Sequence, residues 1–156
     1  MYRSVLVAYN GTGESRSALL ECIRLAPSDS THVHLLAVSH PLSARDLGEY
    51  AVMGSDGISE TLNPNDAKLQ NELYDGLAML RDADLNATAC MVSGKPVDVI
   101  SAMADKLAAD LVIVGHPRRR PWLSRWWRGS TDALLIEKVH CTLMIAPDWQ
   151  ESSSSG

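Results

Sequence analysis

The sequence predicts an α/β fold, a single domain in which a doubly wound parallel sheet of five strands has helices on both faces. Two observations indicate this class. Short apolar and β-branched runs alternate along the chain with segments of helical periodicity, which is typical of parallel strands joined by right-handed crossovers. The run Leu111–Val114 is apolar throughout, as expected of a strand that is buried on both faces.

The first strand and helix are expected directly after the amino terminus. Ser4–Tyr9 is a short apolar run that ends at the turn pair Asn10-Gly11. Glu14–Ala26 then places its apolar side chains on one helical face, and a proline follows it. A second strand is predicted at His32–Ser39.

The middle of the chain is expected to hold a long connection, a helix and a strand. Pro41–Asp66 contains several glycines and prolines, so we expect an irregular, mobile segment there. Ala67–Arg81 carries leucines at spacings of four, four and three, which predicts an amphipathic helix. Asn86–Val92 is the predicted third strand.

Two more helices and strands are expected in the last third of the chain. A Gly-Lys-Pro sequence precedes a helix at Val97–Ala108, and the strand Leu111–Val114 follows. The last helix is predicted at about Ser130–Val139, before a final strand at Thr142–Ala146.

Length and composition fit one cytoplasmic domain. A chain of 156 residues can bury a sizeable core, and no apolar run approaches the roughly 18–20 residues that span a bilayer. We expect the domain to cover residues 1–147 and residues 148–156 to form a flexible tail. The amino terminus shows no signal-peptide pattern, and no CxxC pair is present. Small buried thiols in a reducing compartment are therefore expected at Cys22, Cys90 and Cys141.

Basic residues gather in one segment of an otherwise acidic chain. The net charge is −5, yet five of the 14 basic residues lie in Arg118–Arg128, and three tryptophans lie among them. This loop could clamp a phosphate with its arginines or dock a protein partner. It could also be a solvated loop whose tryptophans cover core edges. Nucleic-acid binding by base stacking is least favoured, because the remaining chain is acidic.

The carboxyl ends of the first and fourth strands are the expected ligand site. Ligands bind doubly wound sheets beyond these ends, where the winding reverses. Gly129-Ser130-Thr131 opens the last helix, and its unpaired backbone N–H groups and hydroxyls favour an anion. Alternatively, Ser130 only caps the helix. Asn10 has two readings as well, as a hydrogen-bonding group for a ribose or base and as half of a turn pair.

The residues offer no catalytic set and no metal site. The five histidines show no HxxxH or HExxH spacing, although His32 and His34 alternate on a strand as an exposed pair. No Ser-His-Asp or Cys-His arrangement can be assembled. The chain also lacks the GxGxxG and GxxxxGK[ST] phosphate motifs. A binding protein is therefore expected rather than an enzyme.

Three stretches of the chain resemble the universal stress protein family. They are VLVAYNGTGESRSAL, SGKPVDVISAMADKLAADLVIVG and GSTDALLIEKVHCTLMIAP, and the likeness covers Met1–Pro147. The resemblance implies a sheet in the order 3-2-1-4-5. It also implies a homodimer that pairs through the last strand, Thr142–Ala146.

Many members of this family bind ATP through a Gly-x2-Gly-x9-Gly-Ser/Thr signature and an aspartate after the first strand. Carried over by position, the resemblance implies that the nucleotide contacts Ala8, Tyr9, Asn10, Val38, Gly115, Arg118, Arg119, Gly129, Ser130 and Thr131. Two of these positions depart from the pattern. Asn10 replaces the aspartate, and Arg118 replaces the middle glycine, so its side chain must swing aside or fill the pocket.

We therefore expect an adenine-nucleotide-binding stress-response protein that acts as a ligand-sensitive dimeric switch. ATP or another adenine nucleotide is the expected ligand, with Mg²⁺ as its companion ion. The alternative is a protein-interaction module that binds no nucleotide and docks a partner through the Arg118–Arg128 loop. A third, weaker hypothesis is an ATP-hydrolysing enzyme that uses Asp132 through a bound metal.

Overall fold

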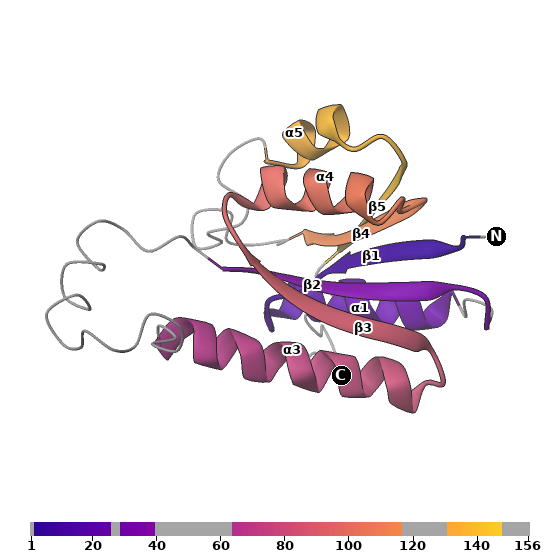
Figure 1. Ribbon diagram of the computed structural model, residues 1–156, viewed down its shortest axis with the longest axis vertical. Helices are drawn as coiled ribbons and strands as arrows, with labels where there is room; N and C mark the ends of the chain where they lie inside the picture. Colours follow the sequence, from indigo (N-terminus) through magenta and orange to yellow (C-terminus); the bar gives the residue numbers. More distant parts are fainter. Residues whose placement is uncertain (1, 26–28, 40–63, 117–130, 148–156) are drawn as a thin grey trace, which may run out of the picture.

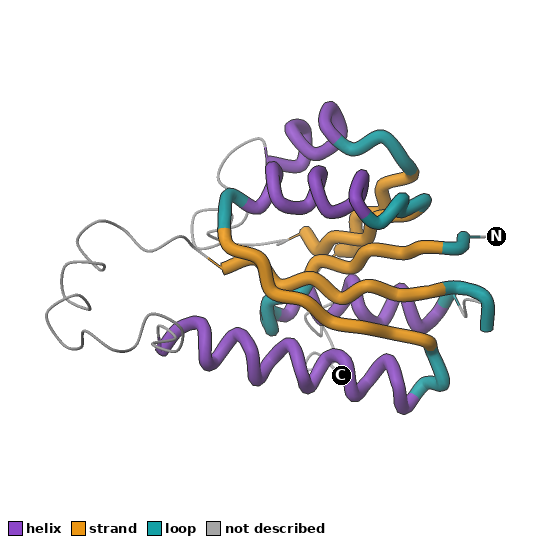
Figure 2. The backbone as a smooth tube through the Cα atoms, in the orientation of Figure 1, coloured by secondary structure: helices purple, strands orange, loops and turns teal. Residues whose placement is uncertain are grey.

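The computed structural model describes residues 2–25, 29–39, 64–116 and 131–147. Within these residues strands and helices alternate along the chain, as Figure 2 shows. The elements are β1 (Ser4–Ala8), α1 (Gly13–Arg24), β2 (His32–Ser39), α3 (Pro64–Asp82), β3 (Asn86–Ser93), α4 (Pro96–Lys106), β4 (Leu111–His116), α5 (Thr131–Lys138) and β5 (Thr142–Pro147).

The five strands form one sheet in the order β3-β2-β1-β4-β5, and every pair of neighbours is parallel. Helices α1 and α3 cover one face of the sheet, and α4 and α5 cover the other (Figure 1). The predicted α/β fold and strand order are confirmed. The winding reverses between β1 and β4, so the carboxyl ends of these two strands are the switch point of the sheet.

Successive side chains of β1 point to opposite faces of the sheet, so this strand contributes to both hydrophobic cores. Val5 and Val7 are buried in the core against α1 and α3, whereas Leu6 and Ala8 are buried in the core against α4 and α5. This double burial explains why the central strands are apolar at nearly every position.

Asp110 joins the amino ends of β1 and β4. Its carboxylate accepts hydrogen bonds from the backbone N–H groups of Arg3, at 2.8 Å, and Ser4, at 3.0 Å. Burial alone would raise the pKa of this carboxyl, but the hydrogen bonds from backbone N–H groups, those of Arg3 and Ser4 first, together with the amino-terminal charge, lower it overall. The Asp110 backbone N–H also donates to the Ser4 carbonyl, at 2.9 Å. The two central strands are thus fixed together at the end opposite the switch point.

Some sequence expectations need correction. The irregular connection was expected to run to Asp66, but α3 begins at Pro64, because proline suits the first turn of a helix. Only Cys22 is fully buried, and burial raises the pKa of its thiol to about 12. Cys90 and Cys141 are half-buried, since they lie in β3 and next to β5, the two edge strands of the sheet.

Candidate functional site

The turn after β1 is fixed by a small polar network. The Asn10 side-chain oxygen accepts hydrogen bonds from the Thr12 backbone N–H, at 3.1 Å, and from the Thr12 hydroxyl, at 2.6 Å. Thr12 is also the N-cap of α1, because its hydroxyl accepts from the Ser15 backbone N–H, at 3.4 Å. The Ser15 hydroxyl in turn accepts from the Asn10 backbone N–H, at 3.3 Å. Asn10 is therefore part of a preorganised turn.

Gly115 at the end of β4 allows α1 to pack directly on the sheet. A Cβ atom at this position would lie 1.9 Å from the Glu14 carbonyl oxygen and 2.8 Å from the Ser15 backbone nitrogen. Both atoms belong to backbone, which cannot move aside as a flexible side chain can. The first glycine of the predicted signature thus has a structural role, which is to bring the β1–α1 turn against the end of β4.

Three of the predicted nucleotide contacts have buried side chains. Ala8 and Val38 are packed in the core beneath α4 and α5. Tyr9 is packed on the opposite face, in the core beneath α1 and α3, and its backbone N–H donates to the Leu36 carbonyl. Tyr9 is fully buried, so its ring is not an exposed stacking platform for a base.

The Tyr9 hydroxyl lies between α1 and α3. Burial raises its pKa, the nearby Arg16 guanidinium lowers it, and the carboxylates of Glu72 and Asp75 raise it further, with a net increase. Among the described residues no group meets this buried oxygen with good hydrogen-bond geometry. Gly76 makes room for the ring, since a Cβ there would lie 2.9 Å from a ring carbon.

Glu72 brings α3 against the β1–α1 turn. Gly11 has a φ of +83°, and a Cβ atom at Gly11 would lie 2.7 Å from the Glu72 side chain. Glycine is needed at this position for its backbone angle, whereas the flexible Glu72 side chain could move aside. Sequence reasoning missed Glu72, because no local pattern links it to a turn some sixty residues earlier in the chain.

The structure brings together part of the predicted site. Asn10 follows β1, Gly115 is the last residue but one of β4, and Val38 lies near the end of β2, so these residues share the carboxyl edge of the sheet. Thr131 is described as the first residue of α5. Arg118, Arg119, Gly129 and Ser130 lie outside the described residues, as do the tryptophans of the Arg118–Arg128 loop.

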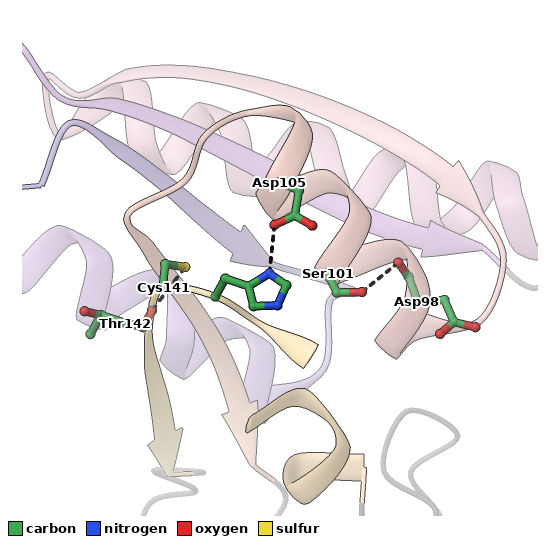
Figure 3. Close-up of polar contacts among 6 residues, drawn as sticks. Asp98, Ser101, Asp105, Cys141 and Thr142 are labelled. Carbon is green, nitrogen blue, oxygen red and sulfur yellow. Dashed lines mark hydrogen bonds and ion pairs between the residues drawn. The ribbon is translucent and has the colours of Figure 1, made fainter. Parts of the chain in front are cut away.

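Polar contacts join α4 to α5 and to the turn after it. Lys138 donates a hydrogen bond to Asp98 at 2.7 Å, and this bond with the lysine charge lowers the pKa of Asp98. The His140 ring lies 3.5 Å from the Asp105 carboxylate. A dashed line to the labelled Asp105 marks this contact in Figure 3. These exposed contacts hold α5 and the turn that leads to β5 against α4.

Within the described residues no three or more His, Cys, Asp and Glu side chains are grouped to hold a metal ion. None of the described helices is long and apolar enough to cross a membrane.

The chain matches the model of the Universal stress protein family over residues 1–147, and it belongs to that family. The resemblance seen in the sequence is confirmed. A comparison with curated proteins finds no match.

Solved structures similar to this one include three nucleotide complexes. A universal stress protein in complex with cAMP is 18% identical, with a TM-score of 0.66 over 94% of this chain and 98% of that chain. A family member from Arabidopsis thaliana with AMP bound is 18% identical, with a TM-score of 0.64 over 98% and 95%. A universal stress protein from Archaeoglobus fulgidus in complex with dAMP is 14% identical, with a TM-score of 0.63 over 93% and 98%. At these identities the likeness shows the fold.

Proposed function

We propose that this protein binds an adenine nucleotide at the carboxyl edge of β1 and β4, as a cytoplasmic stress-response protein. One observation carries the proposal. Gly115 lets the first turn of α1 press against β4, so that Asn10 and the end of β4 lie at the switch point of the sheet. Ligands of doubly wound sheets bind at this point. The nucleotides in the three similar structures support adenine as the base.

Adenosine would be held mainly by backbone in this site. Ala8, Tyr9 and Val38 have buried side chains, and the Tyr9 N–H already donates to the Leu36 carbonyl, so contacts from these strand ends would come from the remaining backbone groups rather than from side-chain donors. The Asn10 oxygen already accepts two hydrogen bonds from Thr12. Its amide nitrogen, which is a donor only, is then the group left for the ribose. An aspartate would accept from both ribose hydroxyls, so we expect weaker ribose binding here.

The phosphates would lie toward the start of α5. We propose that Gly129, Ser130 and Thr131 supply N–H and hydroxyl donors, as the sequence pattern predicts, and that Arg118 or Arg119 balances the phosphate charge. A Mg²⁺ ion would accompany a triphosphate. In this proposal no residue acts as a base, so the nucleotide serves as a signal and is not hydrolysed.

Nucleotide occupancy would act as a switch in a homodimer. The segment that carries the arginines and tryptophans connects β4 to α5, and α5 leads to β5. A phosphate bound at the start of α5 would favour one arrangement of this segment, and so change the surface shown to other proteins. Among the described strands β5 is at an edge of the sheet, and its Ile145 is exposed, which supports pairing through β5.

Equilibrium dialysis with labelled AMP and ATP tests the proposal. We expect saturable binding that approaches one nucleotide per chain, with unlabelled ATP but not CTP competing for the site. An absence of bound label at millimolar nucleotide would contradict nucleotide binding and favour the protein-interaction module instead. Phosphate released from ATP during the same incubation would contradict the non-enzymatic part.

A further inference from the structure

A pair of histidines lies on β2 at the end of the sheet opposite the proposed nucleotide site. His32 and His34 are separated by one residue, so both side chains stand on the face that carries α4 and α5. Their ring centroids are 4.3 Å apart, with 43° between the ring planes. Both residues are partly exposed, so solvent and small ions reach them.

The two imidazoles converge on one small group. Thr88 of β3 is paired with His34 in the parallel register. Its hydroxyl oxygen lies 2.9 Å from Nε2 of His32 and 3.5 Å from Nδ1 of His34. A hydroxyl has a single hydrogen and can donate it to only one of these nitrogens. Nε2 of His32 and Nδ1 of His34 are thus both directed toward the Thr88 hydroxyl oxygen.

Each of the two imidazoles can offer a ring nitrogen to a metal ion. A neutral imidazole has a free lone pair on one ring nitrogen, and this is the form that coordinates a metal ion. Two adjacent imidazoles also cannot both be protonated without repulsion, which a shared cation with both nitrogens as ligands would remove.

We propose that His32 and His34 together form a site for a divalent transition metal ion such as Zn²⁺. Imidazole nitrogen suits this class of ion, and two imidazoles leave the remaining positions to water. Thr88 would then hydrogen-bond a metal-bound water. The site is open and exchangeable, unlike a structural centre with four protein ligands.

A search for the histidine spacings of helices does not find this site in the sequence. HxxxH places two ligands on one face of a helix, but on a strand the equivalent spacing is HxH. The site is independent of the proposed function, because it lies at the amino ends of the strands.

Isothermal titration of the full-length protein with Zn²⁺ alone tests the proposal. We expect one site in the wild-type protein and binding at least about tenfold weaker in H32Q and in H34Q, since even the loss of a supporting group costs 10–100-fold in metal affinity. H140Q is the matched control, because His140 is an exposed histidine beside Asp105, and its Zn²⁺ affinity should equal that of the wild-type protein.

Thermal unfolding gives a second measurement that also reports folding of the variants. Zn²⁺ should raise the melting temperature of the wild-type protein and of H140Q by mass action, and should leave that of the H32Q/H34Q double variant unchanged. The proposal is overturned if the wild-type protein binds no Zn²⁺, or if folded H32Q and H34Q proteins bind it as tightly as the wild-type protein.

Discussion

Asn10 sets the chemistry of the proposed ribose contact. Its side-chain oxygen is held by Thr12, and its amide nitrogen can only donate. Replacing Asn10 with aspartate keeps the acceptor for Thr12 and adds a charged second oxygen for the ribose hydroxyls. Hydrogen bonds to a charged group are worth about 1.5–3 kcal/mol, so we expect N10D to bind AMP about tenfold more tightly. Calorimetric titration measures the change.

Asn10→Ala is the control for the turn, since it removes the acceptor for Thr12 as well as any ligand contact. It should bind AMP more weakly than the wild-type protein. An N10D protein that binds AMP no better than the wild-type protein would show that the ribose does not meet this position.

Among the described glycines, Gly115 lies where the fold leaves the least room for a side chain. The Cβ of an alanine would overlap the Glu14 carbonyl oxygen, so α1 must shift away from β4. Overpacking of this kind typically costs about 1–3 kcal/mol, and we expect G115A to lose at least that much free energy of unfolding in denaturant titrations.

Gly13, which is exposed in the first turn of α1, provides the matched control. G13A should leave the stability unchanged or increase it slightly, because alanine favours helix over glycine. Equal stability of G115A and the wild-type protein would mean that α1 does not pack on β4 as described.

For single residues, the sequence predicts positions in a family pattern better than it predicts packing contacts. The signature positions Asn10 and Gly115 are visible as a family pattern, and the structure places both at the switch point. The close contact of Gly115 with α1 and the approach of Glu72 to Gly11 are not visible, because they depend on how helices pack in three dimensions.

At the scale of elements, α1 depends on its cap. The Thr12 hydroxyl accepts from the Ser15 backbone N–H and donates to Asn10. Thr12→Ala should therefore lower the free energy of unfolding by about 1 kcal/mol, which thermal unfolding can measure. Thr12→Ser keeps the hydroxyl and should retain most of the stability. If both variants are as stable as the wild-type protein, the cap does not stabilise the helix.

The contact of Asp110 with β1 makes stability depend on pH. Because the pKa of Asp110 is lowered in the folded state, its contribution is present above the unfolded pKa, near 4, and is lost as the pH falls through the folded value. Asp110→Asn should cost about 1–2 kcal/mol at pH 7. The difference from the wild-type protein should shrink as the pH falls below about 4.

Urea unfolding at several pH values measures this difference. A gap between the two proteins that stays constant from neutral to strongly acidic pH would contradict the assigned role of the carboxylate.

Most elements could be predicted from the sequence, because apolar runs and helical periodicity are local signals. Leu111–Val114 indicated a doubly buried strand, and β4 is buried from Leu111 to Gly115. Element ends are harder to predict from the sequence, since they depend on caps and turns. The helix predicted to reach Ala108 ends at Lys106, and Ala108 adopts a positive φ of 49° in the turn that follows.

For the whole molecule, the edge strand β5 is the proposed dimer surface. Replacing the exposed Ile145 with aspartate would place a charge in an apolar contact, so we expect I145D to shift the protein from dimer to monomer. Light scattering during gel filtration measures the mass. Leu20→Asp, on an exposed position of α1, is the control and should remain dimeric. A monomeric wild-type protein would contradict the proposal.

The whole account depends on a ligand site at the switch point between β1 and β4. A ¹⁵N–¹H correlation spectrum recorded during titration with AMP tests this most directly, because each backbone amide reports separately. We predict saturable shifts for the amides of Asn10, Gly11, Thr12 and Gly115, and none at the opposite end of the sheet around His32. No shifts at millimolar AMP, or shifts confined to residues far from this edge, would contradict it.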